Sequence, residues 1–251
     1  MVKVVSIHSF RGGTGKSNLC ANIAAYTAIQ DKNCAVVDTD IQSPGIHVLF
    51  GYGNKKPKYT LNDYLNKKCE IKDVAVDVSK SLKLSNGKIY LVPSAMDANE
   101  ITKILRNGYE VDMLSSGLDE LGEKFNLDYL FIDTHPGLNE ETFLSIAISD
   151  VLLVIMRLDE QDWVGSAVTL EIAKKLEIPK LGLVVNKILP GKDIDEIKKE
   201  VGKTFNVDVA GLVKYYEDLA NLASKGIFIL ENKEHELIND IKRIYEFISS
   251  D

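Results

Sequence analysis

A glycine-rich segment near the amino terminus carries the residue types best suited to chemistry. It reads Phe10-Arg11-Gly12-Gly13-Thr14-Gly15-Lys16-Ser17 and directly follows the apolar run Val4-Val5-Ser6-Ile7. Glycines let backbone N–H groups converge on an anion, and the helix expected to start near Ser17 adds the positive end of its dipole. In such a loop Lys16 reaches the β- and γ-phosphates and the Ser17 hydroxyl binds Mg²⁺. The segment therefore predicts a nucleoside triphosphate site.

The loop departs from the standard phosphate-binding pattern, which has glycine where this chain has Phe10. Its Arg11-Gly12-Gly13 instead resembles the deviant loop of the MinD/ParA family, Lys-Gly-Gly-x-Gly-Lys-Ser/Thr. In that family the first lysine reaches across a dimer interface to the partner's nucleotide. The resemblance implies the same role for Arg11, whose guanidinium keeps the charge and offers phosphate a bidentate fork. The alternative is that Arg11 sits on a solvated loop.

Two acidic motifs follow apolar segments further along the chain. Asp38 and Asp40 come directly after one such segment, and Asp133 ends Leu130-Phe131-Ile132. Ligands of open α/β sheets bind at the carboxyl ends of the strands, where carboxylates suit Mg²⁺ and water. Aspartate is also common in strand-to-helix turns, so the Asp38/Asp40 pair taken alone fits a structural turn equally. With the glycine-rich loop, however, three separate pieces are expected at one edge of one sheet.

The resemblance to MinD/ParA ATPases covers about Val2 to Phe247 and implies a role for each acidic residue. Asp40 would orient the attacking water, Asp38 would support Mg²⁺ and its loop, and Asp133 would hold the water shell of the metal. His135 stands where the second switch segment of the family usually has proline. We expect it to be a loop histidine, with a pH-sensitive or partner-facing group as the alternative.

The resemblance also implies where the base of the nucleotide binds. Asn186 would recognise adenine, although an asparagine that caps a turn is the alternative. The base pocket is expected along Val213–Tyr216, where Lys214 and Tyr216 replace the usual proline and aspartate. The implied catalytic residues are Lys16, Asp40 and Arg11, and the implied metal ligands are Ser17, Asp38, Asp40 and Asp133. The implied nucleotide contacts are Gly12, Gly13, Thr14, Gly15, Lys16, Ser17, Asn18, Asn186, Lys187, Val213 and Tyr215.

The contents of 45% hydrophobic and 27% charged residues are typical of a folded protein. The length fits one large domain over residues 1–251, with two small domains as the alternative, and the lack of repeats and of a linker favours one domain. The three cysteines, Cys20, Cys34 and Cys69, have no CxxC spacing, which is typical of a reducing compartment. No apolar run approaches the ~20 residues that span a bilayer. The amino terminus passes straight into strand sequence, unlike a signal peptide. We therefore expect a cytoplasmic protein.

The net charge of −7 disfavours a general nucleic-acid-binding surface. Direct DNA binding would need a local basic patch, and the paired cations at 174–175, 198–199 and 242–243 fit solvated helix faces equally well. The segment 237–251 has an apolar face at helical spacing, but its polar face is mixed in sign. It is therefore expected to pack on the domain and not to bind a membrane.

Alternating strand and helix patterns predict an α/β fold, with a largely parallel twisted sheet and helices on both faces. Strands are expected over 2–9, 34–39, 88–93, 127–133, 151–156, 181–186 and 207–213. Helices are expected over 18–29, 45–50, 61–66, 140–148, 161–176, 193–205, 217–224 and 234–249. One or two more are expected over 98–125, with a break near Asn107-Gly108. Asp162 is interpreted as a helix N-cap and Trp163 as core, with a partner or dimer contact as the alternative for Trp163.

The main hypothesis is a homodimerising switch that binds ATP and Mg²⁺ and hydrolyses ATP slowly. Two ATP-bound subunits would close face to face with Arg11 on the opposite nucleotide, and a regulatory or cargo protein would respond to the state. Such a switch would position or partition a cellular cargo. The alternatives are a ParA-type DNA-partitioning ATPase and a nucleotide-binding regulatory module without hydrolysis. The lack of a CxxC and of a methionine-rich insertion argues against the iron–sulfur carriers and the tail-anchored-protein targeting ATPase.

Overall fold

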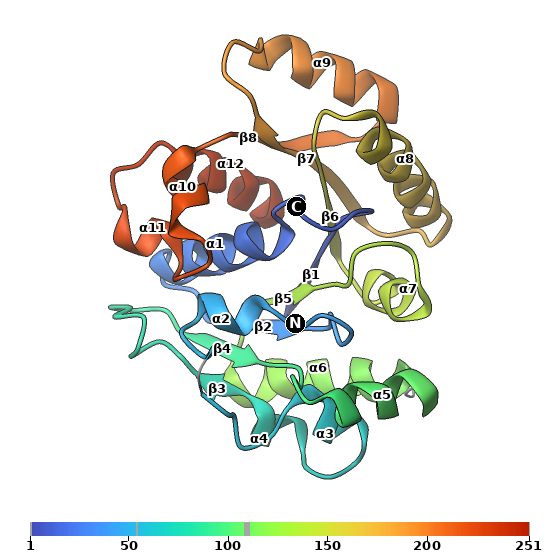
Figure 1. Cartoon of the computed structure of the whole chain (residues 1–251), viewed down its shortest axis with the longest axis vertical. Helices are drawn as coiled ribbons and strands as arrows, with labels where there is room; N and C mark the ends of the chain where they lie inside the picture. Colours follow the sequence, from blue (N-terminus) through green and yellow to red (C-terminus); the bar gives the residue numbers. More distant parts are fainter. Residues whose placement is uncertain (1, 54, 108–110, 251) are drawn as a thin grey trace.

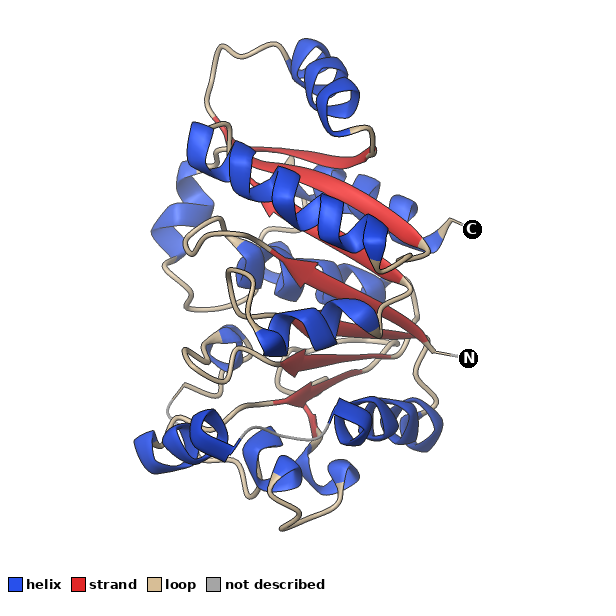
Figure 2. Cartoon of the chain, turned by 90° about the vertical axis from the view of Figure 1, so that its right-hand side faces the viewer, coloured by secondary structure: helices blue, strands red, loops and turns tan. Residues whose placement is uncertain are grey.

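The protein is built on one eight-stranded sheet, with strands in the order β3-β4-β2-β5-β1-β6-β7-β8. The structure is a computed structural model and describes residues 2–53, 55–107 and 111–250. Every neighbouring pair is parallel except β3 with β4. The strands lie side by side with a continuous twist between two layers of helices (Figure 2). Their bounds are β1 (Lys3–His8), β2 (Cys34–Asp38), β3 (Val76–Asp77), β4 (Ile89–Val92), β5 (Tyr129–Asp133), β6 (Val151–Met156), β7 (Lys180–Ile188) and β8 (Asp208–Lys214).

One face of the sheet packs on a layer formed by both ends of the chain (Figure 1). Alternate strand residues such as Val5, Val36 and Leu153 point into this core, which α1 and α12 cover directly. The alternation follows from strand geometry, because successive side chains point to opposite faces. The helices of this layer are α1 (Lys16–Ile29), α2 (Ile46–Leu49), α10 (Glu217–Leu222), α11 (Phe228–Glu231) and α12 (Leu237–Ser249).

The opposite face carries two separate apolar cores. One lies under α3 (Leu61–Leu65), α4 (Ile71–Val74), α5 (Ala98–Asn107) and α6 (Val111–Phe125), against strand residues such as Val37 and Leu130. The other lies under α7 (Glu140–Ala147), α8 (Glu160–Lys175) and α9 (Ile194–Phe205), against residues such as Val154 and Val185. Because both faces are covered, the central strands are almost continuously apolar, as parallel sheets require.

The predicted α/β architecture is confirmed, and β6 has the bounds expected from the sequence. The short elements α4, β3 and α11 were not predicted, and β7 extends beyond the expected 181–186. The closing helix begins at Leu237 and not at residue 234, because Leu237 N–H donates to His235 Nδ1 and closes a turn before the helix. The expected break near Gly108 falls on residues 108–110, which lie outside the described ranges. Among helices of the described ranges, none has the length and apolar character needed to cross a bilayer.

Gly211 lets α12 approach β8 closely. A Cβ added at Gly211 would lie 2.4 Å from Ile244 Cγ1 of α12, whereas a Cβ at Gly202 in α9 would meet nothing nearer than 3.7 Å. We expect Gly211→Ala to lower the free energy of unfolding by about 1–3 kcal/mol, because the helix must move away. The control Gly202→Ala should raise it by about 0.5–1 kcal/mol, because alanine loses less backbone entropy in a helix.

Urea unfolding of the two variants, followed by circular dichroism, measures both effects. Equal stability of Gly211→Ala and the wild type would contradict the close packing of α12 on β8.

Candidate functional site

The sheet register places the predicted acidic residues beside the glycine-rich loop. Strands β2, β5 and β1 are consecutive in the sheet. Asp133 at the end of β5 pairs in register with Asp38 on one side and with Ile7 on the other. The chain leaves β1 immediately after His8 and enters the glycine-rich loop. The three motifs predicted to share one edge therefore do so, at the carboxyl ends of the strands where ligands of such sheets bind.

The backbone of the glycine-rich loop is tied down from the end of β7. Asn186 Nδ2 donates to the Thr14 carbonyl oxygen at 2.7 Å, and Lys187 Nζ donates to the Gly13 carbonyl oxygen at 2.8 Å. In a trans peptide the carbonyl and the following N–H point in opposite directions. The N–H groups of Thr14 and Gly15 therefore point away from β7. Neither donates a hydrogen bond to any residue that the structure describes.

The start of α1 completes an anion cradle. Gly13 and Gly15 have φ of +78° and +95°, which favour glycine. A Cβ at Gly15 would lie 2.4 Å from Asn186 Nδ2, so this position also needs glycine for the close approach. The N-cap Gly15 offers no side-chain hydrogen bond, and the first turn of α1 holds no acidic residue. The first N–H groups of this 14-residue helix are thus left to an anion.

Lys16 is buried and paired with the aspartate at the end of β5. Its Nζ lies 2.5 Å from Asp133 Oδ1, and the two side chains are 6% and 2% exposed. Burial acts to lower the pKa of Lys16, but the Asp133 carboxylate outweighs it and raises this pKa above its ordinary value. The raised pKa favours a charged lysine at the base of the cradle, which is what phosphate binding would require.

Asp38 and Asp40 shape the loop that follows β2. Asp38 accepts hydrogen bonds from the N–H groups of Asp40 and Gly45, and Asp40 accepts one from Ser43 N–H. Burial raises the pKa of Asp38 well above its ordinary value, and the nearby Asp133 carboxylate raises it further. Crowded carboxylates of this kind are relieved by a cation.

The donor set suits a hydrated cation and not one enclosed by protein alone. Within the described ranges, no three His, Cys, Asp or Glu side chains converge tightly enough to hold a metal ion. Mg²⁺ usually keeps several waters and takes one or two carboxylates together with substrate phosphates. The Ser17 hydroxyl at the start of α1 and the Asp133 carboxylate fit that requirement. The assignment of Ser17, Asp38, Asp40 and Asp133 as metal ligands stays a prediction.

Phe10 occupies the position where the standard loop has glycine, and a second glycine makes room for it. A Cβ added at Gly165 of α8 would lie 2.1 Å from Phe10 Cδ1. The phenyl ring therefore packs directly on the backbone of α8. The loop accepts a large side chain here because Gly165 faces it.

Arg11 forms ion pairs with two aspartates of its own chain. Its guanidinium lies 3.4 Å from Asp159 and 3.7 Å from Asp162 of the same chain, with 40% of the side chain exposed. Asp162 is nearly inaccessible and accepts shorter bonds from Arg157, at 2.8 Å from Nε and 3.0 Å from the backbone N–H. The N-cap of α8 is Asp159 and not Asp162 as predicted, because Asp159 accepts the Asp162 N–H.

The residues expected around the base are only partly exposed. Tyr215 is 42% exposed beside the end of β7, where its N–H donates to the Ile188 carbonyl. Val213 is completely buried in the apolar core, so its side chain does not line an open pocket. Asn186 bonds the loop carbonyl and, through Oδ1, the Lys187 N–H. Trp163 packs on Phe205 of α9 with 4.9 Å between ring centroids, as the core interpretation predicted.

Two histidines have roles that the sequence did not reveal. His135 Nδ1 lies 2.7 Å from Asp40 Oδ1 and so joins the loops after β5 and β2. His8 is completely buried at the end of β1, with Nδ1 2.8 Å from Thr134 Oγ1. The signals in the sequence were the position of His8 next to the glycine-rich loop and the replacement of the usual proline by His135. Neither signal named the partner, because the contacts join residues 126 and 95 positions apart.

Comparison with known proteins shows the family to which this chain belongs. The family described as the AAA domain matches residues 2–180 of the chain, which include the glycine-rich loop, Asp38, Asp40 and Asp133. The chain belongs to the MinD/ParA family of P-loop ATPases. An uncharacterized ATP-binding protein of Methanocaldococcus jannaschii is 25% identical over 233 residues, covering 92% of this chain and 82% of that protein. The septum site-determining protein MinD of Bacillus subtilis is 25% identical over 239 residues, covering 90% and 81%.

Solved structures share the fold over nearly their whole length. The cell division ATPase MinD of Pyrococcus furiosus superposes with a TM-score of 0.82 at 19% identity, covering 99% of this chain and 98% of that one. The septum site-determining protein MinD of Pyrococcus horikoshii, complexed with Mg-ADP, gives a TM-score of 0.80 at 18% identity, covering 100% and 97%. The fold is therefore common to all three chains.

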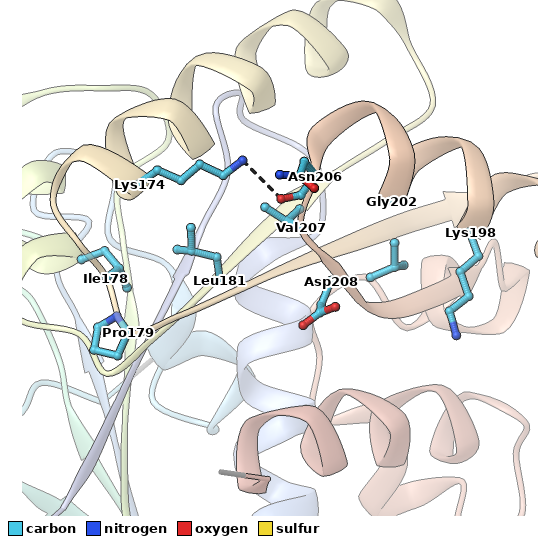
Figure 3. A pocket seen from close by; sticks show the side chains of 10 residues that line it. Lys174, Ile178, Pro179, Leu181, Lys198, Gly202, Asn206, Val207 and Asp208 are labelled. Atoms are coloured by element: carbon cyan, nitrogen blue, oxygen red, sulfur yellow. Dashed lines mark hydrogen bonds between the residues drawn. The ribbon is translucent and has the colours of Figure 1, made fainter.

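A pocket of about 620 Å³ lies between α8, α9, β7 and β8 (Figure 3). It is bounded by the amino ends of β7 and β8, near Leu181 and Asp208, and by α8 and α9. Lys174 reaches over it and donates to the Phe205 and Asn206 carbonyls. Its position at the amino ends of the strands separates it from the ATPase site.

The buried His8 predicts a specific acid sensitivity. Burial, with smaller effects from the charges of Lys16 and His135, lowers its pKa to about 3 from an unfolded value of 6.5. Between these values the unfolded chain binds a proton that the folded chain does not, so stability falls as the pH drops below 6.5. The wild type should lose about 1 kcal/mol more per pH unit than His8→Asn, which cannot titrate but keeps a nitrogen near the Nδ1 position.

Urea unfolding between pH 7.5 and pH 5 measures this difference. Parallel pH dependences of the wild type and His8→Asn would contradict the assignment of a neutral buried His8.

Proposed function

We propose that the protein is an ATP-dependent dimerisation switch that hydrolyses ATP slowly and acts on a cellular cargo through a partner protein. The observation that carries the proposal is the anion cradle with Lys16 at its base, flanked by Asp133, Asp38 and Asp40 at one sheet edge. The proposal also rests on membership of the MinD/ParA family, whose relatives include the septum site-determining protein of Bacillus subtilis.

The residues of the cradle would share the work of binding ATP. Phosphate oxygens would accept from the N–H groups of Thr14 and Gly15 and from the start of α1. Lys16 would move from Asp133 to the β- and γ-phosphates, which frees the Asp133 carboxylate. Mg²⁺, held by Ser17 and by waters on Asp133, would supply neutralising charge to the phosphates.

Hydrolysis would need a water aligned with the γ-phosphorus. Asp40 lies on the loop after β2 and accepts hydrogen bonds through Oδ1, so it is the carboxylate we assign to this water. The water oxygen forms a bond to phosphorus, and the bridging P–O bond breaks with its electron pair on ADP. The proton of the water passes by way of Asp40 to the released phosphate. Positioning and charge stabilisation supply the rate, because the protein contributes no covalent step.

The contacts of Arg11 are weak enough to be exchanged for those in a dimer. At 3.4 and 3.7 Å and with substantial exposure, its ion pairs contribute on the order of 1 kcal/mol or less. Asp162 would stay neutralised by Arg157 when Arg11 leaves. A bidentate guanidinium could then bind phosphate oxygens of the opposite subunit.

The face that carries the P-loop also exposes large apolar side chains. Met96, Leu158, Leu189 and Tyr215 follow the carboxyl ends of β4, β6, β7 and β8 and are 38% to 65% exposed. A second copy docked face to face would cover them and bring the two Arg11 side chains to the nucleotides. This arrangement supports an ATP-bound homodimer.

Light scattering with Mg²⁺ and either no nucleotide, ADP or ATP tests the proposal on Asp40→Ala. We expect a dimer only with ATP, because hydrolysis becomes too slow to reopen it. Adding Arg11→Ala should return the protein to a monomer, whereas adding Arg11→Lys should keep the dimer, since lysine retains the charge.

Lys16→Ala is the control for nucleotide binding and should bind ATP at least 100-fold more weakly, because the phosphates lose their buried cation. Its thermal unfolding must be checked, since Asp133 loses its partner. A monomer with ATP in every variant that binds ATP would contradict the switch and favour a nucleotide-binding regulatory module.

A further inference from the structure

His135 forms a direct side-chain link between the two acidic loops of the ATPase site. Its Nδ1 lies 2.7 Å from Asp40 Oδ1, and the two side chains are only 20% and 12% exposed. A carboxylate oxygen accepts, so the Nδ1–H of His135 donates. The MinD/ParA pattern has proline here, which has no side-chain donor. This link is therefore a feature of this chain and not of the family pattern.

The main chain around His135 is held firmly. The Thr134 N–H donates to the Ile7 carbonyl at 3.3 Å, and the Gly137 N–H donates to the Ser9 carbonyl at 3.0 Å. The His135 carbonyl itself accepts from Thr142 Oγ1 of α7 at 3.3 Å. These bonds attach the loop after β5 to β1 and α7, so the imidazole is presented from a fixed backbone.

Only one oxygen of Asp40 is engaged. Oδ1 accepts from both His135 and the Ser43 N–H, at 2.7 and 3.0 Å. Oδ2 forms no hydrogen bond with any part of the chain that the structure describes. Two donors on one oxygen fix the rotation of the carboxylate and leave the second oxygen to accept from water.

We propose that His135 is a positioning residue for hydrolysis, because it holds Asp40 Oδ1 and so directs Asp40 Oδ2 to the attacking water. The inference rests on the proposed ATPase function and adds a residue that the family resemblance does not supply. His135 acts through Asp40 and, among the described residues, forms no hydrogen bond with the glycine-rich loop or with the start of α1. It should therefore affect the rate of hydrolysis and not the affinity for ATP.

Single-turnover ATP hydrolysis with excess protein tests the role of His135. Replacing His135 by asparagine or by glutamine places an amide nitrogen at two different positions. Asparagine carries its nitrogen where histidine has Nδ1, whereas glutamine carries it nearer the position of Nε2. We expect His135→Ala and His135→Gln to slow hydrolysis about tenfold and His135→Asn to stay within about twofold of the wild type. The dissociation constant for ATP should be unchanged in all three.

The same substitutions on Asp40→Ala separate positioning from a general structural role. With Asp40 absent, His135→Ala should cause no further loss of rate, because the two residues act as a unit. A full additional loss, equal defects in His135→Asn and His135→Gln, or a raised dissociation constant for ATP would each overturn the inference. A wild type that binds ATP but releases no phosphate would overturn the proposed function, and this inference with it. Normal turnover of His135→Ala would overturn this inference alone.

Discussion

The site depends on one buried ion pair, that of Lys16 with Asp133. Both side chains are nearly inaccessible and their charged atoms lie 2.5 Å apart. Removing one member of such a pair costs about 3–5 kcal/mol, because an uncompensated charge is left in the interior. Lys16 reaches Asp133 because β1, which precedes the glycine-rich loop, lies next to β5 in the sheet. Burial, together with the nearby Asp133 carboxylate of this pair, raises the pKa of Asp38 on the neighbouring strand.

The polar contacts around this pair are of two kinds, short contacts and long, exposed ion pairs. The loop backbone is held by short bonds from Asn186 and Lys187, and Asp162 is neutralised in the interior by Arg157. Arg11 makes only long, exposed ion pairs with the same acidic cluster. A charge that has to move between partners is most easily released from such a setting, since solvent already screens much of its interaction.

The positions where this chain departs from the usual pattern have partners far away in the sequence. Phe10 replaces glycine in the loop and packs on Gly165, which lacks a side chain to obstruct it. His135 replaces proline and bonds Asp40. Each departure has its counterpart on another element at the same sheet edge. The fold therefore accommodates both of these departures through contacts at this edge of the sheet.

The order of strands and helices followed from the sequence, because apolar periodicity is local and each buried strand or amphipathic helix carries its own signal. The candidate site residues could also be selected from the sequence, since the chemistry of a phosphate loop and of strand-end carboxylates requires particular types at particular spacings. Their roles stay predictions. The pairing of Lys16 with Asp133, the tie from Asn186 to Thr14 and the link from His135 to Asp40 were decided only by the tertiary structure. These contacts join residues about a hundred or more positions apart, and they exist because the strand order of the sheet places the loops side by side. The elements α4, β3 and α11 were not predicted, because they are too short to carry a periodic pattern. Packing on the rest of the protein stabilises them.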